Sequence, residues 1–279
     1  MTFAEQTPVT VGDLTFDVRI DGPDDGVPVL LLHGFPETSA SWTDVVPRLT
    51  DAGMRVVAPD QRGYSPGARP EGVEHYAVDR LAADVVGIAD AQGWDTFHLV
   101  GHDWGAAVAW YVAAHHGDRL RSLTALSVPH LAAYNRALRE DADQQERAAY
   151  IGFLRIEGKA EALLMEDEFR RLRAMYGGDV PAEQVDDYLA RLGEPGALTA
   201  ALSWYRAMTA ELGDLPVVRV PTTLVWGNGD LAIGRTPVEE SAQHVDADYR
   251  FVELDASHWL PEQEPDAVAE AVLVRTGSV

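Results

Sequence analysis

Short apolar runs alternate with amphipathic helical segments along most of the chain. Two runs with alternating apolar positions, Val9–Val11 and Leu14–Ile20, predict antiparallel strands. Later apolar runs, as expected for strands buried on both faces of a sheet, cover residues 28–33, 55–59, 97–101, 123–128 and 221–227. Residues 249–254 predict one more strand. Helical spacing is found at 41–50, 79–92, 106–115 and 265–275. This alternation predicts an α/β fold with a mostly parallel, doubly wound sheet.

The pattern changes between His130 and Leu215. No strand-like run occurs there, and charged helical segments cover residues 141–155, 159–175 and 182–192. An all-helical block inside an α/β chain indicates a lid inserted between two strands. We therefore expect a core formed by residues 1–129 and 216–279, with residues 130–215 as a helical lid.

Composition and charge restrict the partners of the protein. The 279 residues are 46% hydrophobic, which suffices for a large globular core. A formal charge of −23 argues against nucleic acid or an anionic membrane as a partner. The absence of cysteine excludes disulfides and thiolate metal sites. The first residues lack a signal-peptide pattern and no apolar stretch could span a bilayer, so we expect a cytoplasmic protein.

One turn carries the first chemical signal. In LVGHDWGAA, residues 99–107, the frame Gly101-x-Asp103-x-Gly105 matches the turn in which many hydrolases expose a serine nucleophile, but the central residue is an aspartate. A strand precedes Asp103 and a helix follows it, so the carboxylate should stand above the sheet beside a positive helix end. The simpler alternative is that Asp103 only caps the helix.

Two more polar residues end strands on the same edge of the sheet. Asp230 follows the run at 221–227, and His258 follows the run at 249–254. The chain order of nucleophile, acid and histidine is that of α/β-hydrolases. After the first parallel strand, the backbone N–H groups of Phe35 and Trp104 should converge on one anionic oxygen and form an oxyanion hole.

Five motifs together resemble the soluble epoxide hydrolases of the α/β-hydrolase fold: HGFPE (33–37), DQRGY (60–64), GHDWG (101–105), GNGD (227–230) and SHW (257–259). The resemblance implies the α/β-hydrolase fold and a catalytic triad of Asp103, His258 and Asp230. It also implies two lid tyrosines that hold the epoxide oxygen. The segment ALSWYRAM (201–208) resembles the part of the family that carries the second tyrosine, which would be Tyr205.

The first lid tyrosine is matched less closely. The segment from Tyr150 to Glu161 resembles the aromatic-rich family segment that leads into Gly-x-Ala-Glu, which makes Tyr150 the candidate. Tyr134, Phe153 and Tyr176 are its rivals. Tyr205 also shares a helical face with several apolar residues, so a purely structural role in the core is its alternative.

The proposed chemistry explains the aspartate. Attack on a saturated epoxide carbon would leave a serine as an ether, whereas it leaves Asp103 as an ester that activated water can cleave. The expected partners are a small apolar epoxide and water, in a pocket lined by Phe35, Trp104 and Trp259. No metal or organic cofactor is expected, because this chemistry needs neither. The histidines His102, His115, His116 and His130 also have no metal-ligand partners at recognisable spacing. The sequence leaves a homo-oligomer open.

One loop departs from the family pattern. Three functions other than epoxide hydrolysis also remain open. Tyr64 is followed by Ser65-Pro66-Gly67 instead of Gly-x-Ser, which concerns one entrance loop. A haloalkane or haloacid dehalogenase would use the same triad, but Phe35 offers no halide donor and residues 130–215 hold no His-Trp pair. The second function is that of a non-catalytic ligand-binding protein. The third is that of an ester or lactone hydrolase that uses water directly.

Overall fold

A computed structural model of the chain describes residues 5–209 and 213–278. Its eight strands form one sheet in the order β1-β2-β4-β3-β5-β6-β7-β8. The strands are β1 (Gln6–Val11), β2 (Leu14–Asp21), β3 (Val27–Leu32), β4 (Met54–Pro59), β5 (Phe97–His102), β6 (Leu120–Leu126), β7 (Thr222–Gly227) and β8 (Tyr249–Leu254). The predicted α/β class is confirmed.

Most strand pairs of the sheet are parallel. Only β1 with β2 and β2 with β4 run antiparallel, at one edge. The central strand β3 pairs in parallel with β4 and β5, so that Leu30 lies beside Val57 and Leu99. Because parallel strands end at the same edge, β3, β5, β7 and β8 deliver the loops that follow them to one end of the sheet.

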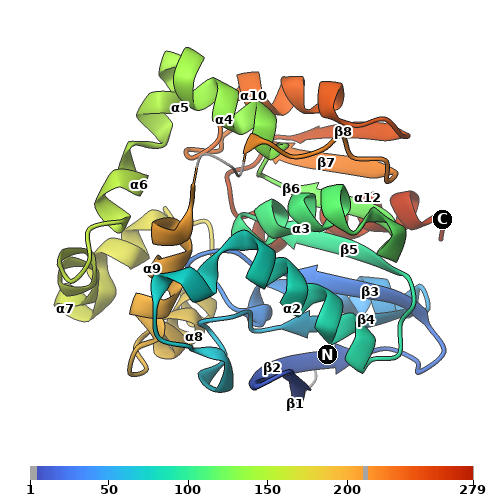
Figure 1. Cartoon of the computed structure of the whole chain (residues 1–279), viewed down its shortest axis with the longest axis horizontal. Helices are drawn as coiled ribbons and strands as arrows, with labels where there is room; N and C mark the ends of the chain where they lie inside the picture. Colours follow the sequence, from blue (N-terminus) through green and yellow to red (C-terminus); the bar gives the residue numbers. More distant parts are fainter. Residues whose placement is uncertain (1–4, 210–212, 279) are drawn as a thin grey trace.

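Helices cover both faces of the sheet (Figure 1). Alternate residues of β3 point to opposite faces: Leu30 and Leu32 join one apolar cluster, and Val29 and Leu31 join the other. The first cluster includes residues of α2 (Val78–Ala91) and α3 (Trp104–His115), and the second includes residues of α1 (Val46–Asp51) and α12 (Pro265–Thr276). The remaining elements in the core are short: η1 (Ser39–Trp42), η2 (Pro66–Ala68), η3 (Val73–Tyr76), η4 (Gly117–Arg119), α10 (Arg235–Glu240), η6 (Ser241–His244) and α11 (Leu260–Gln263).

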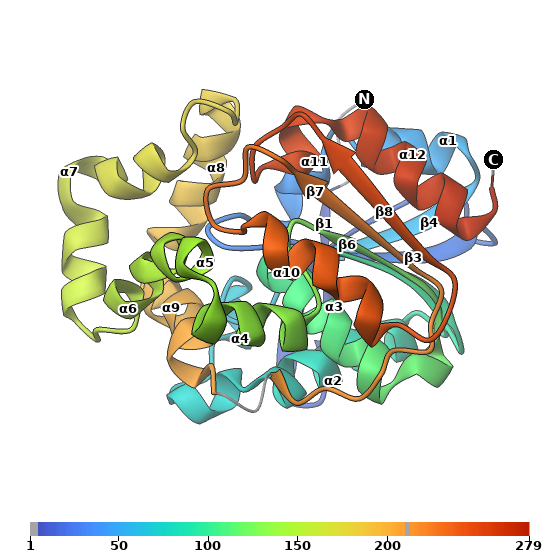
Figure 2. The same cartoon turned by 90° about the horizontal axis from the view of Figure 1, so that it is seen from above.

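Between β6 and β7 the described residues contain helices and no strand. They are α4 (Leu131–Glu140), α5 (Ala142–Arg147), α6 (Ala149–Leu154), α7 (Lys159–Met175), α8 (Ala182–Leu192) and α9 (Ala197–Ala207). Figures 1 and 2 show α6–α9 gathered beyond one end of the sheet. No helix in the described part of the chain combines the length and apolarity needed to cross a bilayer.

Several predicted helix boundaries were wrong. The helix expected at 41–50 is a 3-10 turn followed by α1, because Pro47 favours a helix start at this point. The helix expected at 141–155 is two helices, which separate at Ala148, where ψ is −1°. The segment at 159–175 is interrupted at Glu166–Phe169, where the backbone leaves helical geometry.

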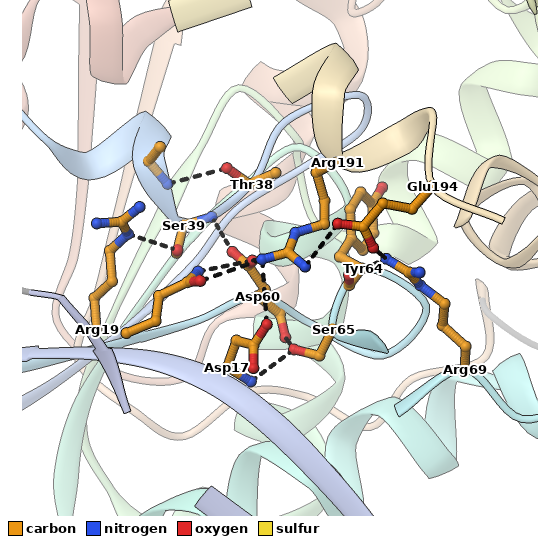
Figure 3. Close-up of polar contacts among 12 residues, drawn as sticks. Asp17, Arg19, Thr38, Ser39, Asp60, Tyr64, Ser65, Arg69, Arg191 and Glu194 are labelled. Carbon is orange, nitrogen blue, oxygen red and sulfur yellow. Dashed lines mark hydrogen bonds and ion pairs between the residues drawn. The ribbon is translucent and has the colours of Figure 1, made fainter. Parts of the chain in front are cut away.

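A polar junction fixes α8 to the core (Figure 3). The guanidinium of Arg191 lies 3.2 Å from an oxygen of Asp17 and 3.3 Å from one of Asp60. Asp60 is 1% exposed, and its other oxygen accepts a hydrogen bond from Ser39 N–H at 2.8 Å. Nearby, Arg69 pairs with Glu194 at 2.7 Å. The aspartate of the DQRGY motif therefore joins the edge of the sheet to α8.

Candidate active site

Asp103 occupies a sharp turn between β5 and α3. Its φ of 50° and ψ of −120° are rare for a residue with a side chain, and such strain occurs at functional sites. Two glycines make the turn sterically feasible: a Cβ at Gly105 would lie 2.2 Å from the Leu32 carbonyl oxygen, and one at Gly34 would lie 2.3 Å from Asp103 Cβ. The turn therefore holds the Asp103 carboxylate against the loop after β3.

The carboxylate of Asp103 does not cap α3. The helix has no side-chain hydrogen bond from its cap residue, whereas Asp103 Oδ1 accepts a hydrogen bond from Phe35 N–H at 2.8 Å. This amide is one of the two expected oxyanion donors. The role of Trp104 N–H stays a prediction, because the backbone amide found bonded to this carboxylate is that of Phe35.

The structure brings the three predicted triad residues together. His258 Nε2 lies 3.4 Å from Asp103 Oδ2, and His258 Nδ1 lies 2.7 Å from Asp230 Oδ2. The other oxygen of Asp230 accepts hydrogen bonds from Ala232 and Ile233 N–H, at 2.7 and 3.0 Å. Asp230 is thereby held in place and orients the imidazole toward Asp103.

The charges of the triad shift its pKa values. Burial alone would lower the pKa of His258, but the carboxylates of Asp230 and Asp103 outweigh burial and raise it well above its usual value. Burial raises the pKa of Asp103, but its contact with His258 more than offsets this, so the pKa lies below its usual range. Both shifts favour an ion pair between the His258 imidazolium and the Asp103 carboxylate.

Two buried residues that we did not assign to the site support His258. His102 Nε2 and Ser127 Oγ lie 2.8 and 2.9 Å from the carbonyl oxygen of His258, to which both donate. His102 Nδ1 lies 3.0 Å from Glu37 Oε2, which also accepts from Gly34 N–H. The Glu37–His102 pair thus connects the loop of Phe35 with the loop of His258. Glu37 lies within the motif HGFPE and His102 within GHDWG, so these two motifs were the sequence signal that could have revealed the pair.

Two cavities meet at Asp103. The small cavity is about 80 Å³ and includes Val128, Leu131, Tyr134, Leu138, Ile151 and Met208 among its walls. The large cavity is about 520 Å³ and includes Phe35, Phe153, Leu164, Met175, His258 and Trp259. Asp103, Tyr150 and Tyr205 border both. Of the expected pocket residues, Trp104 lines the small cavity, and Phe35 and Trp259 line the large one.

Tyr205 and Tyr150 face the same space as Asp103. Tyr205 is 3% exposed, and its ring packs edge-on against Phe35 and Trp104, with centroids 5.4 and 5.1 Å apart. It is therefore both a packed aromatic and a cavity wall. Tyr150 comes from α6 and is half-buried. Burial, with the charge of Asp103 adding to it, raises the pKa of both phenols well above the usual value, which keeps them protonated as donors.

The rivals of Tyr150 are placed differently. The Tyr176 hydroxyl donates to the Pro36 carbonyl oxygen at 2.8 Å, so it is engaged away from the cavities. Tyr134 lines only the small cavity, and Phe153 has no hydroxyl to donate. Tyr150 alone of these four residues borders both cavities.

An ion pair joins α9, the helix that carries Tyr205, to α7. Arg206, next to Tyr205 on α9, lies 2.8 Å from Glu161 on α7, and the two side chains are 7% and 13% exposed. Removing one partner leaves an uncompensated charge, so Arg206→Met and Glu161→Met should each lower the free energy of unfolding by about 3 kcal/mol. The double Met variant should recover most of this loss in urea unfolding. A double variant as unstable as the sum of the two single variants would show that the side chains do not interact.

The comparisons with known proteins agree with this arrangement. The chain matches the family model for the alpha/beta hydrolase fold over residues 27–265. The chain belongs to the α/β-hydrolase fold family. Epoxide hydrolase A of Mycobacterium tuberculosis is 35% identical to this α/β-hydrolase, over 91% of this chain and 92% of that protein. The AB hydrolase superfamily protein YfhM of Bacillus subtilis is 34% identical over 95% of each chain.

A solved structure also links this chain to epoxide hydrolases. A structure described among novel epoxide hydrolases from metagenomes of hot environments is 30% identical, with a TM-score of 0.87 and 99% coverage of both chains. The predicted resemblance to epoxide hydrolases of this fold is confirmed, and the chain is classed with these enzymes. Among the described residues, no cluster of histidine and acidic side chains is arranged to hold a metal ion.

Proposed function

We propose that this protein opens an epoxide to a vicinal diol through a covalent ester on Asp103. The observation that carries the proposal is the position of a carboxylate at the nucleophile turn, with His258 on one side and two protonated phenols across the same cavity. Helices α4–α9, the proposed lid over residues 130–215, supply Tyr150 and Tyr205 and close the cavities away from the sheet. The mostly apolar walls suit a substrate with one oxygen acceptor.

The first step would be ring opening. Asp103 Oδ2 attacks one epoxide carbon, and the bond from that carbon to the ring oxygen breaks. Tyr150 and Tyr205 donate hydrogen bonds to that oxygen, and one of them transfers its proton to it. The His258 imidazolium then returns a proton to the phenol, because the loss of negative charge on Asp103 lowers its pKa. The products of this step are a hydroxyalkyl ester and a neutral imidazole.

The second step would be hydrolysis of the ester. His258, held by Asp230, takes a proton from water, and the water oxygen attacks the carboxyl carbon of Asp103. Phe35 N–H already bonds Asp103 Oδ1, the oxygen on which the negative charge develops, and Trp104 N–H is the proposed second donor. The leaving diol oxygen takes up the proton that His258 accepted from water. The second water proton, left on the Asp103 carboxyl group, passes to His258, so that the carboxylate and the imidazolium are restored.

The lid tyrosines provide the test of this proposal. Tyr205→Phe and Tyr150→Phe should each slow ester formation by a factor on the order of 10 to 1,000, because each removes one donor to the ring oxygen. Rapid mixing with an aryl epoxide would measure ester formation directly. Tyr134→Phe, on the wall of the small cavity, is the matched control and should have little effect.

The results of these assays distinguish Tyr150 from Tyr134 as the first acid, and an epoxide hydrolase from a dehalogenase. If Tyr134→Phe slows ring opening and Tyr150→Phe does not, Tyr134 is the first acid. If Tyr150→Phe and Tyr205→Phe both open epoxides at the parent rate, the proposed electrophilic pair is wrong. Release of halide from haloalkanes without diol formation from any epoxide would favour a dehalogenase.

A further inference from the structure

Two acidic side chains, Glu37 and Glu262, lie close together behind His258. Glu37 belongs to the loop after β3, and Glu262 lies on α11, which begins directly after Trp259. The Glu37 side chain is fully buried and Glu262 is half-buried, and in each residue one carboxyl oxygen is inaccessible to solvent. Removing a carboxylate from water is costly unless its oxygens find donors or the group keeps its proton.

One oxygen of each acid has donors and the other has none. Glu37 Oε2 accepts a hydrogen bond from Gly34 N–H and lies 3.0 Å from His102 Nδ1. Glu262 Oε1 accepts a hydrogen bond from the Tyr188 hydroxyl at 2.8 Å. Among the described residues, no donor reaches Glu37 Oε1 or Glu262 Oε2. Because the two side chains lie within hydrogen-bond reach of each other, one proton between these two oxygens would satisfy both.

The neighbouring groups indicate which of the two acids holds that proton. Burial raises the pKa of Glu37, but the contact with His102 outweighs burial and leaves this pKa below its usual value. Burial, and then the charge of Glu37, raise the pKa of Glu262 well above its usual value, although the bond from Tyr188 acts in the opposite direction. The phenols of Tyr176 and Tyr188 also face the pair, and burial together with the charges of the two acids raises the pKa of each. Both carboxyl shifts favour a protonated Glu262 beside an ionised Glu37.

We infer that Glu262 is a neutral carboxylic acid that donates a hydrogen bond to Glu37 and thereby positions the loop of His258. Four side chains then connect α8 to the carbonyl oxygen of His258, in the order Tyr188, Glu262, Glu37 and His102. Loss of the Glu262 proton at alkaline pH would break the central bond and place two carboxylates side by side. The positioning role rests on the proposed function, whereas the proton can be tested without a substrate.

Infrared spectroscopy of Glu262→Gln tests for the proton itself. The amide can still donate to Glu37 and accept from Tyr188, but it cannot carry an acidic proton. At neutral pH, the parent-minus-variant spectrum should show the carbonyl stretch of one protonated carboxyl group, and this band should disappear as the pH is raised. Glu270→Gln makes the same chemical change at an exposed position of α12 and should leave the band in place.

Urea unfolding at a series of pH values tests the same proton through stability. The unfolded chain releases it near the ordinary glutamate pKa of 4.5, whereas the folded protein keeps it to higher pH. The parent should therefore lose stability relative to Glu262→Gln as the pH rises from 4.5 to the raised pKa, and the difference should then level off. The expected fall of the parent midpoint relative to the variant is roughly 0.3 to 0.5 M urea per pH unit. Glu270→Gln should follow the parent.

A second variant serves if Glu262→Gln does not fold. Tyr188→Phe removes a hydrogen bond that favours the ionised form of Glu262, so it should move the midpoint of the infrared band to higher pH. A midpoint that stays in place or moves to lower pH in this variant would contradict the assignment of the proton to Glu262.

Diol formation from 2-phenyloxirane tests the positioning role. The ratio of parent to Glu262→Gln turnover should fall as the pH rises, with the same midpoint as the infrared band, because only the parent loses the bond. No infrared difference, with a urea difference that is independent of pH, would show an ionised Glu262 bridged to Glu37 by water and would overturn the inference. A band that titrates while the turnover ratio stays constant would refute the positioning role. No diol from the parent would contradict the proposed function, and the infrared and urea results would still decide the proton.

Discussion

Asp103→Asn should reduce diol formation by roughly four to six orders of magnitude, which is the scale on which removal of a nucleophile acts. The amide is nearly isosteric with the carboxylate, and its oxygen can still accept the hydrogen bond from Phe35 N–H. It cannot attack an epoxide carbon at a useful rate, and it removes one of the two charges that stabilise the His258 imidazolium. Steady-state turnover of 2-phenyloxirane measures the effect.

The Asp103→Asn variant needs two controls, one for the chemical identity of residue 103 and one for the fold. The engineered amide can hydrolyse slowly back to aspartate, so the mass of each preparation must be checked before and after the assay. Circular dichroism and thermal unfolding would show that the fold persists. Turnover of the verified amide at more than about one hundredth of the parent rate would contradict a nucleophilic role for Asp103.

The sequence carried enough information for the sheet and for the three triad residues. Continuous apolar runs mark strands buried on both faces, and the polar residue that follows such a run lies at the carboxyl edge of the sheet. Asp103 and Asp230 each follow such a run, and His258 follows the mixed run at 249–254. The structure brings each of the three within 3.4 Å of a neighbouring member. Their chemical roles remain proposals.

Long-range contacts could not be predicted in the same way. The Glu37–His102 pair behind His258 and the Arg206–Glu161 pair between α7 and α9 join residues far apart in the chain, and no periodicity records such pairs. The break in the helix at Ala148 and the interruption of α7 at Glu166–Phe169 were not visible in the helical spacing of these segments either. The walls of the two cavities at Asp103 follow from the same packing, so they could not be predicted from the sequence either.

His258→Gln should separate the two chemical steps. Asp103 can still attack an epoxide in this variant, because ring opening needs no general base. Ester hydrolysis should slow by roughly 10²- to 10⁴-fold, because no group takes a proton from water. In rapid-quench experiments the variant should form the ester and then stop, with at most one diol released per enzyme on the time scale of many parent turnovers.

The charge balance of the site sets a control for this variant. Glutamine leaves the carboxylates of Asp103 and Asp230 without the cation between them, so the folded state should lose stability, by about 3 kcal/mol or more. Activity must therefore be measured at a temperature where the variant is folded. The Tyr205→Phe variant gives the opposite pattern and serves as the kinetic contrast, since it should slow ester formation and accumulate no adduct.

The mass of His258→Gln after incubation with 2-phenyloxirane tests the covalent account most directly. We predict a gain equal to the mass of the whole epoxide, located by peptide mapping on the peptide that contains Asp103, and absent from the Asp103→Asn variant. A haloalkane that leaves an adduct lighter by one hydrogen halide, while epoxides leave none, would favour a dehalogenase. Diol formed at the parent rate by His258→Gln, with Asp103 unmodified throughout, would contradict the covalent mechanism.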